Sequence, residues 1–257
     1  MRDLNNKIVL ITGATSGIGK ACAGEFAKLG ANLLLIARRN ERLIEITEQL
    51  AVKYHTKVKT IQLDIRKYAD VRNKYQQLDD EWKTVDIIIN NAGLARGLSK
   101  IFEGDVDHWE EMIDTNIKGL LYITRTFLPN MVERETGHII NIGSTAGHET
   151  YVFGNVYAAT KFAVRALSHS IRLDVLDKGI KVTSIDPGMV MTEFSKVRFS
   201  GDEERANKVY EGIEPLSAQD IAESVVFAAT RPKNVNINEL ILTPLYQASS
   251  SQVYRQK

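Results

Sequence analysis

The sequence has few of the features that mark secreted, membrane-spanning or metal-dependent proteins. It contains one cysteine, Cys22, so no disulfide can form within the chain. No run approaches the roughly 18 apolar residues of a membrane-spanning helix, and the opening MRDLNNK lacks the apolar core of a signal peptide. The 5 histidines show no metal-ligand spacing. We therefore expect a cytoplasmic protein without a metal site.

The charges of the chain are nearly balanced. With 33 Lys and Arg against 32 Asp and Glu, the formal net charge is +1, which gives no reason to expect nucleic acid or an anionic membrane as a partner. Hydrophobic residues make up 44% and charged residues 25%, as in an ordinary folded domain. No repeat, low-complexity tract or Pro/Gly/Ser-rich linker divides the chain, so we expect one domain over 1–257.

Short β-branched and aliphatic runs alternate with longer helical patterns. This alternation is typical of βαβ units and a parallel sheet. In such a sheet the carboxyl ends of the strands share one edge, where ligands bind. The predicted strands are 8–12, 32–37, 57–63, 85–90, 138–143, 181–186 and 239–243.

A glycine-rich turn, TGATSGIG, follows the first predicted strand and precedes a predicted helix over 20–29. Gly13, Gly17 and Gly19 allow close approach of the backbone to a ligand. The helix start offers unpaired N–H groups and the positive end of its dipole to a pyrophosphate. The GxxxGxG spacing differs from the usual dinucleotide fingerprint GxGxxG. The turn predicts a dinucleotide site, and a plain tight turn is the alternative.

The second predicted strand ends where an NAD-binding fold places an acidic residue for the ribose 2′-OH. Here the chain reads Ala37, Arg38 and Arg39. None of these repels a 2′-phosphate, and the guanidinium of Arg38 offers it a bidentate fork. We therefore expect NADP rather than NAD as the cofactor. The alternative is that the arginines only begin a solvated helix.

Tyr157 and Lys161 stand four residues apart in YAATK, which places them on one helix face. A tyrosine titrates near about 10, so we expect the ammonium of Lys161 to lower the pKa of Tyr157. Ser144 ends an apolar run that predicts a strand, and it could hold a substrate oxygen while Tyr157 transfers the proton. A Tyr and a Lys at this spacing can also pack together without function.

Together these segments resemble the short-chain dehydrogenase/reductase family over nearly the whole chain. The resemblance rests on TGATSGIG, Asp64 after the third strand, NNAG at 90–93, Asn116, Ser144, YAATK and the PGMVMTEF stretch from Pro187. It implies an α/β, Rossmann-type doubly wound fold with a seven-stranded parallel sheet flanked by helices. It also implies a catalytic tetrad, in which the asparagine holds a water of a proton relay behind the lysine. The tetrad residues are Asn116, Ser144, Tyr157 and Lys161.

The resemblance also implies the cofactor-binding residues. Asp64 would accept from the adenine amino group, Lys161 would bind the nicotinamide ribose, and Thr192 would hold the carboxamide. An Asp that merely ends a strand and a Thr that caps the next helix are the alternatives. The implied set is Gly13, Ser16, Gly17, Ile18, Gly19, Arg38, Arg39, Asp64, Ile65, Asn91, Ala92, Gly93, Tyr157, Lys161, Pro187, Gly188, Val190 and Thr192.

The charged segment 193–215, EFSKVRFSGDEERANKVYEGIEP, predicts a mobile lid that sets substrate choice. ARRNERL, NNAGLARG and TEFSKVRFSGD are similar to the subgroup of NADP-dependent 3-hydroxy acid dehydrogenases that also oxidise serine. A carboxylate-bearing substrate needs a cation. Arg198 is the first candidate and Arg96 the second, and either could instead be a surface residue. Ser144 and Tyr157 complete the expected substrate site.

Three functions are compatible with these features. The first is hydride transfer between NADP(H) and the 3-hydroxyl or 3-oxo group of a small acid, such as serine or another 3-hydroxy acid, with Tyr157 as general acid/base. The second is reduction of a 3-oxoacyl thioester. The third is a catalytically silent NADP-sensing protein, against which the intact tetrad argues.

The predicted helix that carries Tyr157 and Lys161 has more apolar residues than one sheet-facing stripe requires. A second buried face suggests a partner subunit. The resemblance implies a homotetramer, and a monomer with these residues packed internally is the alternative.

Overall fold

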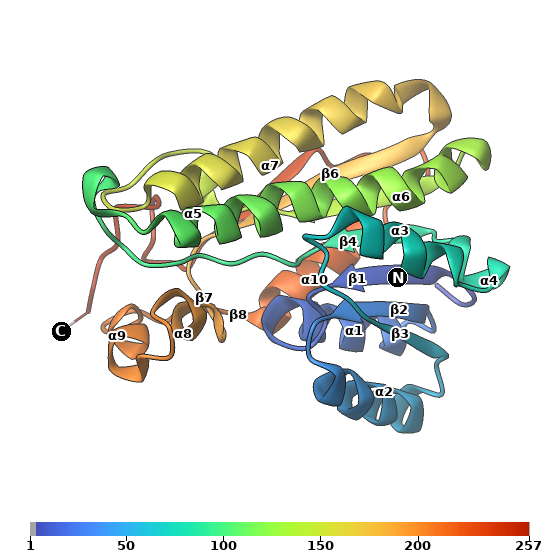
Figure 1. The fold of residues 1–257 in the computed structure, drawn as a ribbon, viewed down its shortest axis with the longest axis horizontal. Helices are drawn as coiled ribbons and strands as arrows, with labels where there is room; N and C mark the ends of the chain where they lie inside the picture. Colours follow the sequence, from blue (N-terminus) through green and yellow to red (C-terminus); the bar gives the residue numbers. More distant parts are fainter. Residues whose placement is uncertain (1–3, 257) are drawn as a thin grey trace.

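Seven parallel strands form the centre of the molecule (Figure 1). The computed structural model describes residues 4–256, so residues 1–3 of the MRDLNNK segment and residue 257 lie outside the described part. The strand order is β3-β2-β1-β4-β5-β6-β9, which confirms the expected doubly wound Rossmann-type fold. The strands are β1 (Ile8–Thr12), β2 (Asn32–Ala37), β3 (Val58–Gln62), β4 (Ile87–Asn90), β5 (Gly137–Ile142), β6 (Ile180–Pro187) and β9 (Glu239–Leu242).

The central strands are buried on both faces, which explains their nearly continuous apolar sequences. All residues of β1 and β4 are buried, and β1 pairs with β2 on one side and with β4 on the other. The chain therefore leaves β1 in one direction and β4 in the other. The crevice between their carboxyl ends is the expected ligand position in such a fold.

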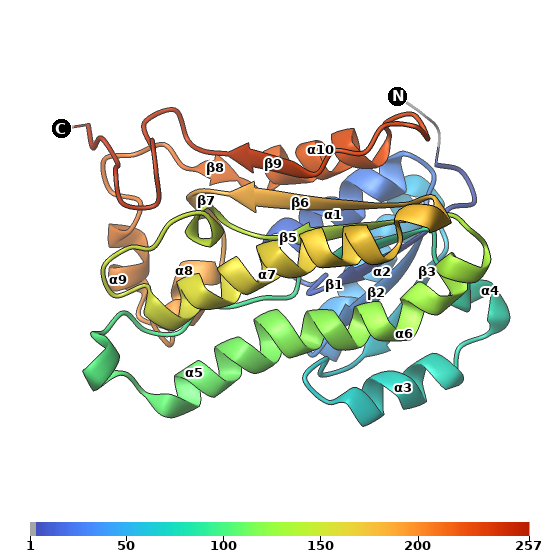
Figure 2. The ribbon, with the colours of Figure 1, turned by 90° about the horizontal axis from the view of Figure 1, so that it is seen from above.

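Helices cover both faces of the sheet (Figures 1 and 2). One face packs against α1, α2 and α10, and buries Cys22 and Phe26 of α1 completely. The other face packs against α3, α4, α6 and α7. Within residues 4–256, no helix has both the length and the apolar character needed to cross a membrane. The helices are α1 (Gly17–Lys28), α2 (Asn40–Tyr54), α3 (Tyr68–Gln76), α4 (Asp80–Lys83), α5 (Val106–Ile113), α6 (Leu120–Glu133), α7 (Asn155–Asp174), α8 (Phe194–Arg198), α9 (Glu203–Lys208) and α10 (Ala218–Ala229).

Helix α5 continues into α6 through a π-helical turn over Asp114–Gly119. A π-turn widens the helix locally and often marks a functional position. Asn116 lies in this turn and is buried. The turn therefore directs the predicted tetrad asparagine out of the regular helix register.

A second, two-stranded parallel sheet pairs β7 (Val190–Met191) with β8 (Leu216–Ser217). Its strands flank the predicted lid, so both ends of segment 193–215 are fixed beside each other. Helices α8 and α9 form much of this segment and lie at the end of the molecule away from α2 and α4 (Figure 1). The sequence did not predict β7 or β8, because a two-residue strand has too few positions to display a period.

Candidate active site

A cavity of about 320 Å³ opens at the carboxyl ends of the strands. With the exception of Gly19, every residue that the resemblance implied for the cofactor lines this cavity. Ser144 lines it as well, whereas Asn116 and Arg198 do not. The structure thus brings residues from seven distant segments of the chain to one edge of the sheet.

The glycine turn is held by the loop after β4. A Cβ at Gly19 would lie 2.4 Å from the carbonyl oxygen of Gly13, so this glycine lets α1 pack against the turn rather than against a ligand. Thr12 Oγ1 accepts from the backbone N–H groups of Asn91 and Ala92, and Asn91 Nδ2 donates to Thr12 O at 2.9 Å. The Asn91 amide therefore supports the turn.

Asn116 lies behind the cavity and fixes the loop above it. Its Oδ1 accepts from Leu94 N at 2.8 Å, and its Nδ2 donates to Leu94 O and to Thr160 Oγ1. A Cβ at Gly93 would lie 3.2 Å from Asn116 Oδ1 and 3.7 Å from Lys161 Nζ. A side chain at position 93 would therefore crowd the asparagine amide, while its contact with the lysine would be an ordinary one.

Lys161 is buried from α7 against β5. Its Nζ donates to Ile142 O at 2.9 Å, and the residue is 7% exposed. Burial lowers the pKa of Lys161 to about 8, and the nearby charge of Asp186 opposes this shift. The ammonium of Lys161 therefore titrates close to neutral pH.

Tyr157 differs from the expectation in its electrostatics. Burial raises the pKa of the Tyr157 phenol, while the charge of Arg198 and a hydrogen bond with Ser144 oppose the rise. Lys161 Nζ lies 5.9 Å from the Tyr157 ring centroid. The expectation that Lys161 lowers this pKa is thus wrong for the protein alone, because desolvation outweighs the nearby charges and the cation that acts on the phenol is Arg198.

Arg198 from α8 packs onto Tyr157. Its guanidinium carbon lies 5.0 Å from the Tyr157 ring centroid and 5.1 Å from that of Phe194, and its Nη2 donates to Tyr151 Oη at 3.0 Å. Its Nε is buried without a hydrogen-bond partner among residues 4–256. Arg198 therefore brings a cation beside Tyr157, although it does not line the main cavity.

Arg96, the second candidate for a substrate carboxylate, is engaged elsewhere. Its Nε donates to Glu111 at 2.6 Å and its Nη1 donates to Val197 O at 2.8 Å. These contacts tie the loop after β4 to α5 and to the lid segment. Arg96 is thus an anchor in this structure rather than a free cation at the substrate site.

Around Asp64 and Arg38, the cavity contains ion pairs that the sequence did not reveal. Arg66 donates to both carboxylate oxygens of Asp64, which lowers the pKa of Asp64. Glu111 lies 3.8 Å from Arg38 and 3.5 Å from Arg66. Asp64 is therefore already paired, and Arg38 remains the more exposed arginine, with 55% of its side chain accessible. An arginine two positions after a strand-ending Asp is a signal that could have identified this pair.

Thr192 and Arg39 both line the cavity. Thr192 Oγ1 accepts from Phe194 N at 3.2 Å, as in the capping alternative, and its methyl side faces Gly17. Arg39 donates to Thr15, Ser16 and Glu193. Three partners therefore orient the Arg39 guanidinium. The sequence predicted only that Arg39 lies near the end of the second strand.

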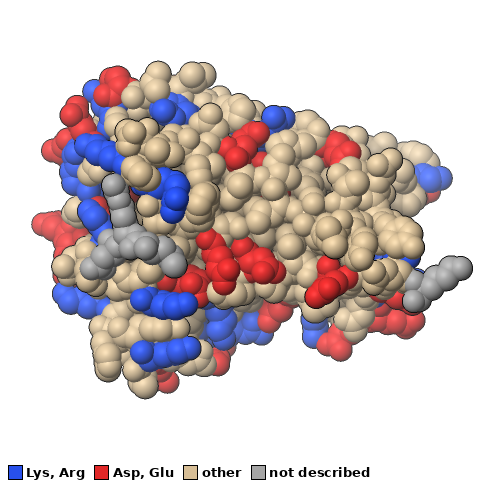
Figure 3. Space-filling view, turned by 180° about the vertical axis from the view of Figure 1, so that it is seen from behind, with Lys and Arg blue, Asp and Glu red and all other residues tan. Residues whose placement is uncertain are grey.

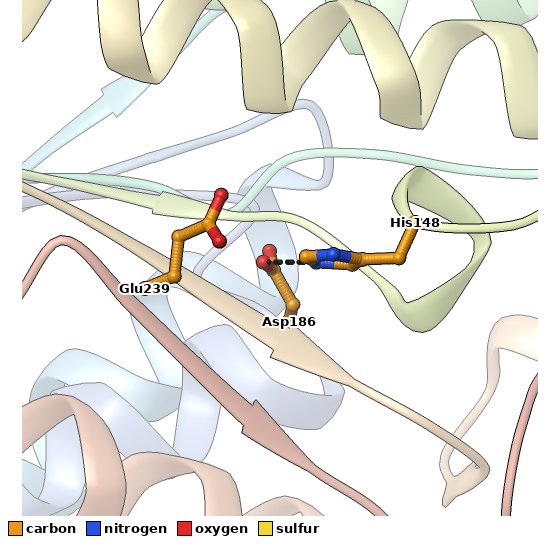
Figure 4. Close-up of side chains that lie close together, drawn as sticks. All are labelled: His148, Asp186 and Glu239. Atoms are coloured by element: carbon orange, nitrogen blue, oxygen red, sulfur yellow. Dashed lines mark hydrogen bonds and ion pairs between the residues drawn. The ribbon is translucent and has the colours of Figure 1, made fainter.

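Behind Lys161, three side chains of metal-ligating type lie together (Figure 4). His148 Nε2 and the buried Asp186 Oδ2 are 2.8 Å apart, and Glu239 lies close to both. Ser184 donates to Asp186, while Arg165 and His169 donate to Glu239 Oε1. Protein donors therefore hold these carboxylates, and the group is an ion-pair network. Sequence spacing could not reveal it, because its members come from three separate elements.

Comparisons with known proteins agree with this geometry. A profile of the short chain dehydrogenase family matches residues 7–203. The chain is 47% identical over 242 residues to an NADP-dependent 3-hydroxy acid dehydrogenase of Salmonella typhi, covering 94% of this chain and 96% of the relative. It is 41% identical over 249 residues to a serine 3-dehydrogenase of Rhizobium radiobacter, covering 96% and 98%.

A solved structure described as the closed form of serine dehydrogenase complexed with NADP+ superposes with a TM-score of 0.90 at 45% identity. The superposition covers 97% of this chain and 100% of that one. The resemblance drawn from the sequence motifs is thereby confirmed. This chain belongs to the short-chain dehydrogenase family.

Proposed function

We propose that this chain is an NADP-dependent oxidoreductase that transfers hydride between NADP(H) and the 3-hydroxyl or 3-oxo group of a small acid, with serine and 3-hydroxy acids as the substrate class. The observation that carries this proposal is the meeting of Tyr157, Ser144 and Lys161 at one cavity, with Arg198 stacked on the tyrosine. The printed names of the relatives support the coenzyme and the substrate class.

The cavity fits a dinucleotide. Gly13 and Gly17 adopt positive φ angles of 66° and 50°, so the turn presents backbone rather than side chains. Arg38 and Arg39 follow the end of β2, where they would bind a 2′-phosphate. Asn91, Lys161 and the 187–192 stretch also line the cavity, and we assign the nicotinamide half to them. When bound, NADP supplies the hydride acceptor, and NADPH the donor, at the nicotinamide ring.

We assign the proton transfer to and from the substrate oxygen to Tyr157. Because burial raises its pKa, the phenol carries its proton at neutral pH and is ready to protonate a substrate oxygen during reduction. Ser144 orients the same oxygen. Lys161, with a pKa of about 8, provides a nearby cation for the phenolate that this proton transfer leaves, and the same phenolate is the base that accepts the substrate proton during oxidation.

We assign binding of the substrate carboxylate to Arg198. Its Nε lacks a partner among the described residues, and its guanidinium already lies against Tyr157. Segment 193–215, which carries Arg198, acts as the lid. Ordering of this segment would place the arginine over the substrate.

Two further assignments complete the proposal. We assign a homotetramer, supported by large apolar side chains exposed on α7 and α10, and we retain the cytoplasmic location expected from the sequence. The oligomer follows the family expectation stated above.

Tyr157→Phe tests the proposed chemistry. The variant retains the ring that packs on Phe194 but lacks the hydroxyl, so turnover should fall by at least about a thousandfold while NADP binding changes little. Steady-state kinetics with serine and 3-hydroxybutyrate gives the first quantity, and calorimetry gives the second. Unchanged turnover would end the assignment of the proton to Tyr157.

A further inference from the structure

The carboxylate of Glu193, at the start of the lid, lies between two arginines of the coenzyme-binding half. Its oxygens accept from Arg42 Nη1 at 2.7 and 3.0 Å, and Oε2 also accepts from Arg39 Nη1 at 3.0 Å. Arg39 is the second residue after the end of β2, and Glu193 is 154 positions further along the chain. The contact therefore joins the base of the lid to the α2 side of the crevice.

Arg39 is shared between this carboxylate and the glycine turn. Its Nη2 donates to Ser16 Oγ at 2.9 Å and to Thr15 Oγ1 at 3.1 Å. The main cavity is lined by Thr15, Ser16, Arg38, Arg39 and Glu193, and Arg42 lines the adjoining pocket that shares Thr15, Ser16 and Glu193. Without a bound coenzyme, the anion that Arg39 binds is therefore the carboxylate of Glu193.

A carboxylate and a phosphate compete for the same guanidinium donors. Both accept from arginine in a bidentate manner, and two anions at one site repel each other. The side chains of Arg39, Arg42 and Glu193 are 42%, 43% and 43% exposed, so water can replace either partner at small free-energy cost. An incoming 2′-phosphate can therefore displace the carboxylate without disturbing the core.

We propose that Glu193 is a specificity-determining residue of the coenzyme site: its carboxylate holds Arg39 and Arg42 until the 2′-phosphate of NADP takes their donors, which releases the base of the lid. The inference rests on the proposed function in placing that phosphate at the end of β2. Glu193 opposes NADP binding and leaves NAD binding unaffected, because NAD brings no competing anion to this rim.

The position of Glu193 connects this exchange to the catalytic centre. The next residue, Phe194, begins α8, and its ring contacts the Tyr157 ring at 5.6 Å between centroids. Arg198 ends the same helix. Release of Glu193 therefore frees the segment that carries both contacts to Tyr157, so coenzyme binding prepares the lid for substrate.

Glu193→Gln tests the competition, because it removes the charge and keeps the size of the side chain. Dissociation constants for 2′,5′-ADP and 5′-ADP are measured by calorimetry, together with those for NADP and NAD. We expect the variant to bind 2′,5′-ADP and NADP about threefold to tenfold more tightly than the wild type. Its affinities for 5′-ADP and NAD should not change.

Glu203→Gln is the matched control. It removes one negative charge from the same lid segment, but Glu203 pairs with Lys196 and not with the coenzyme arginines. We expect its affinities for all four ligands to equal those of the wild type. An equal gain in this control would assign the effect to net charge and overturn the proposal.

Two other outcomes also overturn it. Unchanged or weaker binding of 2′,5′-ADP to Glu193→Gln would mean that the carboxylate orients the arginines for the phosphate. If the wild type itself bound 2′,5′-ADP no more tightly than 5′-ADP, the coenzyme assignment of the proposed function would fail as well.

Hydrogen exchange of the lid base provides a second readout. The amides of residues 193–200 should exchange faster in ligand-free Glu193→Gln than in the wild type, and 2′,5′-ADP should produce a similar increase in the wild type. Identical exchange in the two ligand-free proteins would overturn the proposal that Glu193, through Arg39 and Arg42, restrains the base of the lid.

Discussion

Arg198 carries a positive charge into an enclosed part of the site. Its Nε is buried without a hydrogen-bond partner in the described chain, although its Nη2 donates to Tyr151. A buried donor left in this state costs about 1 to 3 kcal/mol. A substrate carboxylate that accepted from Nε would recover this free energy, which gives a physical reason for the acid group of the substrate to bind here.

Arg198→Ala should weaken the binding of acids selectively. We expect KM for serine or 3-hydroxybutyrate to rise about tenfold to a hundredfold, because a hydrogen bond to a charged group contributes about 1.5 to 3 kcal/mol. KM for a neutral alcohol of similar size should change much less. Steady-state kinetics compares the two substrates, with Arg205→Ala from the same lid segment as the control. Equal effects on both substrates would exclude Arg198 from the carboxylate site.

His138 makes the stability of the protein sensitive to acid. It is buried at the start of β5, contacts Thr183 Oγ1 at 2.8 Å, and its pKa is lowered by burial from 6.5 to about 3. Between these values the unfolded chain binds a proton that the folded chain excludes. The free energy of unfolding therefore falls as the pH drops below about 6.5, by about 2 kcal/mol at pH 5.

His138→Gln removes this titration and retains a polar group near Thr183. We expect the variant to lose about 2 kcal/mol less stability than the wild type between pH 7 and pH 5. Urea unfolding at the two pH values measures the loss. Because the comparison uses the difference between pH values, a uniform destabilisation of the variant does not affect it. Parallel losses in the two proteins would contradict the assignment.

We expect the residues at the end of β2 to determine which coenzyme the protein prefers. Ala37→Asp with Arg38→Leu places a carboxylate where it accepts from a ribose 2′-OH and repels a 2′-phosphate. We expect the ratio of kcat/KM for NADP to that for NAD to fall about a hundredfold. Arg72→Leu on α3 is the control and should leave the ratio unchanged. An unaltered ratio in the double variant would mean that Arg39 and Arg42, rather than Ala37 and Arg38, determine the preference for NADP.

The long strands and the site residues on them could be predicted, because buried parallel strands give continuous apolar runs. Parallel order then places residues such as Gly13, Arg38 and Asp64 at one edge, as the cavity confirms. Strands β7 and β8 could not be predicted, since each has two residues and depends on its partner.

The sequence did not predict which charged side chains lie next to one another. The pKa of Tyr157 depends on burial and on Arg198, which α8 brings back from 41 positions further along the chain, whereas the helical spacing indicated only Lys161. Glu193 and Glu111 likewise pair with arginines from distant segments. Local patterns identify which groups are present, but the fold determines which of them meet.

Exposed apolar side chains on the surface of the molecule support the proposed tetramer. Seen from behind, on the side where β9 and α10 lie in Figure 2, a wide area carries no charged side chain (Figure 3). Phe227 of α10 and Ile241 of β9 are 47% and 52% exposed, and Leu173 of α7 is 73% exposed on another surface. Apolar exposure on separate surfaces fits an assembly with more than one kind of interface.

Light scattering of the purified protein should give four times the mass of one chain. Phe227→Glu should reduce this to a dimer, because a charge at one interface leaves the other intact. Lys233→Glu, which changes a charge near α10 without altering an apolar contact, is the control and should remain tetrameric. A wild-type mass of one chain would contradict the assembly.

The short sheet of β7 and β8 has a consequence for how this protein can change. Because pairing of Val190 with Leu216 and of Met191 with Ser217 fixes where the intervening residues depart and return, their length and composition can vary with little effect on the seven-stranded sheet. New substrate preferences can then arise by exchanging this one insert between relatives, provided that the exchanged segment again supplies the contacts that Phe194 and Arg198 make with Tyr157.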